Sequence, residues 1–225
     1  MTNNIFKLII IILFSLITLN VHASEKFNFN VTEVEILENG NIYKGKKRGT
    51  ITSDSGVIVE ADQFEYDKKI NILNASGSVK INDTINNYVI FSEKIIYNKN
   101  KEIIFTNNNS KGISYKDNTE ITAKSFEYNK PKKTLVAKNN VKVENKDKNY
   151  SIKSNFATYL MDEEKILTSG RTSAFIHSKY KIDSKDVIFS KIPMELISNE
   201  NTTISDDYNL YNLKKFIYFI NTEEL

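Results

Sequence analysis

Apolar residues in the middle of the chain recur at every second position, in short runs that polar residues separate. The segments Val59-Glu60-Ala61, Phe64-Glu65-Tyr66 and Leu73-Asn74-Ala75 all alternate between an apolar or small residue and a polar one. A spacing of two is the period of a β-strand and differs from the helical period of 3.6. The pattern therefore predicts an all-β chain built from short antiparallel strands.

The alternating pattern returns along the chain with a period of about 31 residues, which indicates stacked supersecondary units. An aromatic residue marks each copy, at Tyr66, Tyr97, Tyr128, Tyr159 and Phe189. A β-branched residue lies seven positions before each mark, at Val59, Ile90, Ile121, Ile152 and Ile182. A leucine or isoleucine lies seven positions after it, at Leu73, Ile104, Leu135, Ile166 and Leu196.

Each copy is expected to contain about two strands, joined by short loops. The alternation changes phase between Ala61 and Phe64, and a shift of one residue requires a bulge or a corner. A polar turn follows each aromatic mark, and Pro131 and Pro193 fall in such turns, where a missing N–H breaks no ladder bond. A second turn in each unit is predicted at Gly77, Asn108, Asn139 and Gly170.

The two ends of the repeat region carry further strand signals. Asn39-Gly40 predicts a type I′ hairpin turn between residues 34–37 and 41–43, and Asp54-Ser55-Gly56 predicts the next turn. Residues 213–218 look like the opening of a sixth copy. We therefore expect a repeat domain over residues 24–205, followed at 206–225 by the start of another repeat or by a truncated edge.

Residues 1–23 are typical of a secretory signal peptide. Lys7 precedes an apolar run over residues 8–19, and Val21-His22-Ala23 places small residues where a signal peptidase cuts. Cleavage is expected between Ala23 and Ser24. The alternative is an uncleaved anchor, although the run is shorter than the roughly 20 apolar residues that span a bilayer. In both cases the remainder of the chain is exported.

Composition excludes several classes of function. The chain has no Cys and no Trp, and its formal net charge is +3. Without Lys7 the 31 basic residues fall to 30, against 28 acidic ones, so the basic field of a nucleic-acid binder is missing. His177 is the one histidine beyond the leader, so no His-based triad or His-rich metal site can form. We expect no enzyme, no cofactor and no metal site.

One sequence string carries a resemblance to a known family. Residues 60–69, with Glu60-Ala61-Asp62 leading to Tyr66, followed by Leu73-Asn74-Ala75-Ser76-Gly77-Ser78-Val79, resemble the OstA-like repeat. That family includes LptA and the periplasmic N-terminal domain of LptD. Residues 123–143 repeat the pattern and 154–170 repeat it more weakly, so that the resemblance covers about 34–204. Residues 34–61 look more like the LptD version.

The resemblance implies an antiparallel β-jellyroll, an open V-shaped pair of stacked sheets with an apolar interior. It further implies a periplasmic protein, associated with the outer membrane, that binds the lipid A acyl chains of lipopolysaccharide during outer-membrane assembly. Implied partners are other Lpt-type jellyroll proteins, joined edge to edge, and an outer-membrane barrel or an inner-membrane ABC transporter complex. Whether the chain is a free-standing member or part of a longer protein stays open.

The groove of such a carrier would be lined by the inward apolar residues of the repeat. The candidates are Val59, Phe64, Tyr66, Leu73, Ile95, Tyr97, Ile104, Phe126, Tyr128, Leu135, Tyr159 and Ile166. The same residues would equally form a closed core, as in an exported β-repeat adhesin or structural interaction protein. A cluster of Lys44, Lys46, Lys47 and Arg48 either meets lipid phosphates or forms a solvated turn.

Overall fold

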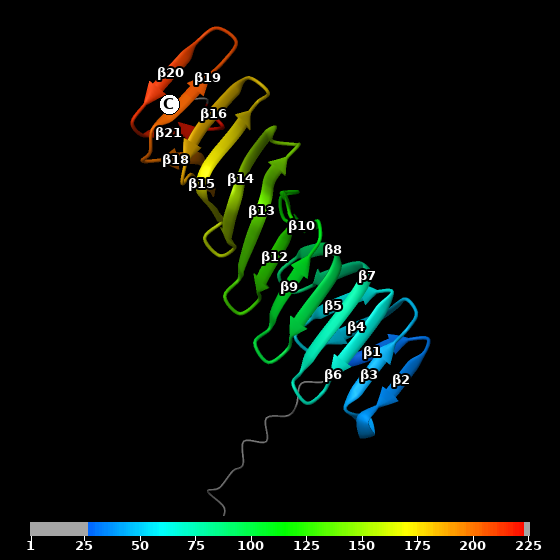
Figure 1. Cartoon of the computed structure of the whole chain (residues 1–225). Coiled ribbons are helices and arrows are strands. Elements are labelled where there is room, and N and C mark those ends of the chain that lie inside the picture. The colour runs from blue at the N-terminus through cyan, green and yellow to red at the C-terminus, as the bar shows by residue number, and fades with distance from the viewer. Residues whose placement is uncertain (1–26, 223–225) are drawn as a thin grey trace, which may run out of the picture.

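The computed structural model describes residues 27–222, and the predicted signal peptide with its Ala23–Ser24 cleavage site lies outside them. The described chain is almost entirely antiparallel β-structure, as predicted (Figure 1). The strands before the middle of the chain are β1 (Phe27–Val31), β2 (Val34–Leu37), β3 (Ile42–Gly45), β4 (Gly49–Ser53), β5 (Val57–Ala61), β6 (Gln63–Asp67), β7 (Ile72–Asp83), β8 (Tyr88–Asn98), β9 (Ile103–Asn107), β10 (Ser110–Ser114) and β11 (Glu120–Ala123). The remaining strands are β12 (Ser125–Asn129), β13 (Thr134–Asn145), β14 (Tyr150–Leu160), β15 (Lys165–Ile176), β16 (Tyr180–Lys185), β17 (Ile188–Lys191), β18 (Met194–Ser198), β19 (Thr202–Ser205), β20 (Leu210–Leu213) and β21 (Phe216–Phe219).

The strands form two layers that share five long strands. Layer A pairs in the order β1-β4-β5-β7-β8-β10-β11-β13-β14-β15-β16-β19-β20. Layer B pairs in the order β2-β3-β6-β7-β8-β9-β12-β13-β14-β15-β17-β18-β21. The strands β7, β8, β13, β14 and β15 run through both layers, and the stack extends from one end of the molecule to the other (Figure 1). This arrangement confirms the expected antiparallel jellyroll.

The chain passes from one layer to the other at bulges. Between β5 and β6 the N–H of Asp62 donates to the carbonyls of Ser76 and Gly77, at 3.2 and 3.1 Å. The β7–β8 register shifts between Ser76 and Val79, and Gly77 there has a φ of +79°. The phase change seen in the sequence is therefore a corner, because a bulge turns the following inward side chains toward the new layer.

The second turn predicted for each unit is wrong. Gly77, Asn139 and Gly170 lie inside β7, β13 and β15, and only Asn108 lies between two strands, β9 and β10. Asn139 has a φ of +64°, so these positions do need the left-handed backbone that turn residues supply. They use it for bulges within continuous strands, since the flanking ladder continues on both sides.

The predicted polar turns join the strands at the side opposite the bulges. Oδ1 of Asp67 accepts the N–H of Lys69 at 2.9 Å, and Oδ1 of Asn129 accepts that of Lys132 at 3.0 Å. These side chains replace backbone partners and close the loops as Asx turns. The hairpin at Asn39-Gly40 also forms, but Leu37 pairs with Ile42, so its loop has four residues and is no two-residue type I′ turn.

The core lies between the two layers. Inward residues from both layers form one apolar cluster that runs from Phe27 to Ile220. Fully burying a large aliphatic or aromatic side chain contributes about 1.5–3 kcal/mol, so this cluster is the main stabilising term. Strands β20 and β21 add one strand to each layer, through pairing with β19 and β18. Within residues 27–222, no helix has the length and apolar composition needed to cross a membrane.

Two glycine substitutions test the role of the bulges. Gly77 and Gly170 have nearly equal φ values, +79° and +78°. A Cβ added at Gly77 would lie 2.6 Å from Asp62 Oδ2. A Cβ added at Gly170 would meet nothing within 4 Å. We expect Gly170→Ala to lower the free energy of unfolding by about 1 kcal/mol, through backbone strain alone. Gly77→Ala should cost about 1 kcal/mol more, because it also displaces the Asp62 corner. Urea unfolding measures both, and equal losses would contradict the role of the corner.

Candidate functional site

The twelve residues predicted to line a groove all lie in the interior between the layers. Their exposed fractions run from 0% to 5%. Val59 belongs to layer A, and the other eleven belong to layer B, so the prediction described one wall of the interior almost alone. Residues of the opposite wall that kept the same period in the sequence are Ile90, Ile121, Ile152 and Ile182. Each of them lies seven positions before an aromatic mark in the sequence, and this constant spacing could have identified them.

The interior is closed in this structure. Among the described residues, the side chains of the two stacked layers belong to one packed cluster. One side of the interior is bounded by the covalent corners of the strands. The other side is bounded by the hairpin loops of the two layers, which face each other without a covalent link. We call this second side the mouth, and a ligand could reach the interior there only if the loops part.

Polar contacts hold the mouth closed along its length. Near the N-terminal end, Lys99 of layer B pairs with Asp54 of layer A, and the side chain of Lys99 is only 2% exposed. Lys130 Nζ donates to the carbonyl of Ser55 at 2.5 Å. The hydroxyl of Tyr128 donates to Asp83 Oδ2 at 2.6 Å. Lys99 and Lys130 each follow an aromatic mark by two residues, as Lys191 does, whereas Met161 holds this position after Tyr159.

A denser group of charges closes the middle of the mouth, and we call it the mouth cluster: Tyr88, Lys116, Asp117, Tyr159, Glu164 and Lys191. The side chain of Lys191 is 5% exposed, and its Nζ lies 2.6 Å from Asp117 Oδ2 and 3.5 Å from Glu164 Oε2. The same Nζ donates to the hydroxyl of Tyr159 at 3.0 Å and lies 4.8 Å from the centre of its ring.

The mouth cluster bridges the two layers. The hydroxyls of Tyr88, from layer A, and Tyr159, from layer B, are 3.2 Å apart. Lys116, in the loop after β10, pairs with Glu164, in the loop before β15. Because Asp117 lies in the same layer A loop as Lys116, its bond to Lys191 on β17 also crosses the mouth.

The environment fixes the charges of this cluster. Burial alone would raise the pKa of Asp117, but the hydrogen bond and charge of Lys191 outweigh it and lower that pKa below its usual 3.8. Burial likewise opposes ionisation of Glu164, but contacts with Lys116 and Lys191 lower its pKa below 4.5. Burial raises the pKa of Tyr88 and of Tyr159 above 10. At neutral pH the carboxylates are therefore ionised and the phenols keep their protons.

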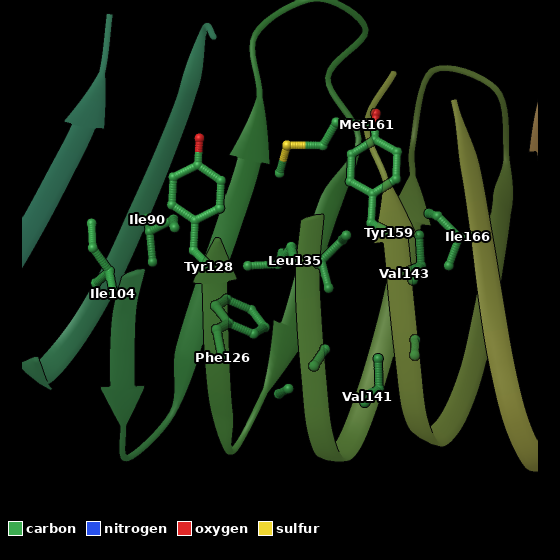
Figure 2. Close-up of a cluster of buried hydrophobic side chains, with 14 of the residues drawn as sticks. Ile90, Ile104, Phe126, Tyr128, Leu135, Val141, Val143, Tyr159, Met161 and Ile166 are labelled. Atoms are coloured by element: carbon green, nitrogen blue, oxygen red, sulfur yellow. The ribbon is translucent and has the colours of Figure 1, made fainter. Parts of the chain in front are cut away.

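An apolar pocket lies in the interior behind the mouth cluster. Its cavity volume is about 20 Å³. Its lining comes from both layers: Tyr88, Val89, Ile90, Gly112, Ile113, Ser114, Thr119, Ile121, Leu135, Tyr159 and Met161. Figure 2 shows Ile90, Leu135, Tyr159 and Met161 in this part of the interior. We call it the Gly112 pocket. No feature of the sequence pattern pointed to it, because it depends on which strands face each other.

The basic cluster near residue 45 is neutralised by neighbouring carboxylates. Lys44 lies 3.1 Å from Glu65, and Lys46 lies 2.8 Å from Glu35. Lys47 and Arg48 are paired in the same way, with Glu33 and Asp62 at 2.5 and 2.9 Å. These side chains are about half exposed, so the geometry is that of a solvated, ion-paired surface.

Comparison with known proteins finds a likeness among solved structures. No family model matches the chain, and no curated protein matches it. The chain is similar to the crystal structure of LptH, described as the LptA-homologous periplasmic component of the lipopolysaccharide transport device of Pseudomonas aeruginosa. The two share 16% sequence identity with a TM-score of 0.46, over 50% of this chain and 81% of LptH.

Removing the buried cation tests the mouth cluster. We expect Lys191→Met to lower the free energy of unfolding by about 1–3 kcal/mol, because it leaves the partly buried Asp117 without its main partner and removes one of the two cations at Glu164. Lys133→Met is the matched control, since Lys133 pairs with Asp162 at 2.9 Å on the surface within layer B. The control should change stability by less than about 0.5 kcal/mol. Chemical unfolding of both variants measures the difference, and equal effects would contradict a structural role for the cluster.

Proposed function

We propose that the protein is a periplasmic carrier that binds lipopolysaccharide by its acyl chains, between the two layers, during outer-membrane assembly. The observation that carries this proposal is the single apolar interior, which extends along the whole stack and is bounded on one side by non-covalent contacts alone. It acts by binding and not by catalysis. The OstA-like resemblance of residues 34–204 and the predicted signal peptide support the same proposal.

The physical task of such a carrier is to keep fatty chains out of water. Each buried CH₂ contributes about 0.8 kcal/mol, so an acyl chain left in solvent costs on the order of 10 kcal/mol. An interior whose inward positions repeat from copy to copy offers an apolar environment at every step along the stack. The sugar head would stay at the mouth, where lysines such as Lys99 and Lys130 line the edge.

The ends of the stack support edge-to-edge assembly with other jellyroll proteins. β2 ends layer B at one end, and β20 and β21 end the two layers at the other. Exposed edge strands pair readily with strands of another chain. These strands also expose apolar side chains, with Ile36 at 59% and Leu210 at 66%. A stack extended in this way would join the interiors of neighbouring molecules, and the resemblance favours the LptD-like branch for this role.

Site-specific photocrosslinking tests lipid binding. Phe126 and Glu127 are adjacent on β12, but Phe126 faces the interior and Glu127 faces outward. A diazirine-bearing phenylalanine analogue at each position, in purified protein mixed with lipopolysaccharide, should give a lipid adduct at position 126 and about tenfold less at position 127.

The competing interpretation is an exported adhesin with a permanently closed core. It predicts no lipid adduct at position 126 in a folded protein. That result would overturn the carrier proposal, whereas equal labelling at both positions would indicate lipid adhering to the surface.

A further inference from the structure

We propose that the Gly112 pocket is the place where an acyl chain enters the interior, and that the mouth cluster is the latch over it. The ligand would be an acyl chain of an anionic amphiphile. This inference rests on the proposed function and adds to it where uptake begins and what controls it. It follows from three observations: a gap in the core, its position behind the latch, and the cations beside it.

The gap arises because β10 presents small residues to the interior. Its inward positions are Ser110, Gly112 and Ser114. The inward positions 31 residues before and after them are Val79, Ile81 and Asp83 on β7, and Val141, Val143 and Asn145 on β13. An added Cβ at Gly112 would lie 3.6 Å from Phe126 and 3.8 Å from Leu135, which are ordinary contacts. The backbone there has no positive φ, so the fold has room for a side chain that the sequence does not supply.

The gap has room for about one water molecule, so an acyl chain would fit there only once the layers part. Protein interiors fill their volume to the density of organic crystals, and the atoms that line a void lose contacts on one side. The pocket exposes apolar surface and no polar surface to its interior. It therefore suits a hydrocarbon chain, which has no hydrogen bonds to satisfy, and does not suit a sugar or a peptide.

The mouth cluster lies directly at this pocket. Tyr88 and Tyr159, whose hydroxyls meet across the mouth, both line the pocket. Farther along the mouth, Lys99 and Lys130 also make contacts between the layers, but neither residue lines this pocket. Parting the layers at the cluster would therefore widen a gap that already lies behind it.

The surface beside the latch can receive an anionic head. A hollow of about 110 Å³ adjoins the cluster, and Lys116, Lys148 and Lys191 are among the residues that line it. In the closed form Lys191 is bound by Asp117 and Glu164. A carboxylate or phosphate of the ligand could replace these side chains as the partner of the lysines, so that opening the latch would not leave the cations unpaired.

The first test fills the pocket. We would measure binding of cis-parinaric acid, a fluorescent fatty acid, to the wild-type protein, Gly112→Leu and Lys111→Leu. Gly112→Leu should weaken binding by about tenfold or more, because its side chain occupies the space of the ligand. Lys111→Leu adds the same residue to the outer face of the same strand and should bind within about twofold of wild type. Circular dichroism checks that all three proteins are folded.

The second test locks the mouth without changing the core. The chain contains no Cys, so Lys116→Cys/Glu164→Cys places two thiols at a contact that crosses the mouth. Joined by a reducible bifunctional reagent, this protein should take up the fatty acid about tenfold more slowly, and reduction should restore the rate. Lys133→Cys/Asp162→Cys, joined in the same way within layer B, is the control and should be unaffected.

The outcomes separate the two proposals. If the wild-type protein takes up neither cis-parinaric acid nor lipopolysaccharide, the proposed function is overturned and this inference with it. If the wild type binds and either Gly112→Leu or the locked protein behaves like it, only the inference about the pocket and its latch is overturned. Loss of uptake in both, with normal controls, supports it.

Discussion

The structure depends on one constraint: each long strand must pass through both layers and keep its backbone hydrogen bonds to the neighbouring strands. Bulges such as the one at Gly77 make this turn, and they fix one side of the interior covalently while the other side is held only by side chains. Everything else follows from this asymmetry. The inward positions of both layers share one core, and the hairpin loops meet at a mouth that can open without any strand being broken.

Much of the fold was accessible from the sequence because it is local and periodic. The alternation of apolar and polar residues predicted the strands, and the change of phase between Ala61 and Phe64 predicted the corners. Gly77 and Asn139 were assigned to turns because a turn and a bulge both need a left-handed backbone, and only the neighbouring strand distinguishes them. The twelve interior residues were located correctly between the layers, but the sequence could not decide whether that interior is a groove or a core.

The functional features that the sequence did not reveal are all long-range. Asp117 and Lys191 meet although they are 74 positions apart, at 117 and 191, and they belong to different layers. The Gly112 pocket requires β10 to face Leu135 and Met161 across the interior. Both features lie at the mouth, the boundary that the repeat does not close covalently. A closed interior behind a boundary of polar, non-covalent contacts is compatible with both the packed core and the proposed lipid binding.

The most direct test of this account is the distance across the mouth, with and without lipid. Spin labels on Tyr115→Cys/Glu163→Cys would report the separation of the two layers beside the mouth cluster, and labels on Lys124→Cys/Asn155→Cys would report the corner side. When lipopolysaccharide binds, the account predicts that pulsed electron paramagnetic resonance shows a longer distance across the mouth and an unchanged distance at the corner. Lipid bound with both distances unchanged would contradict it.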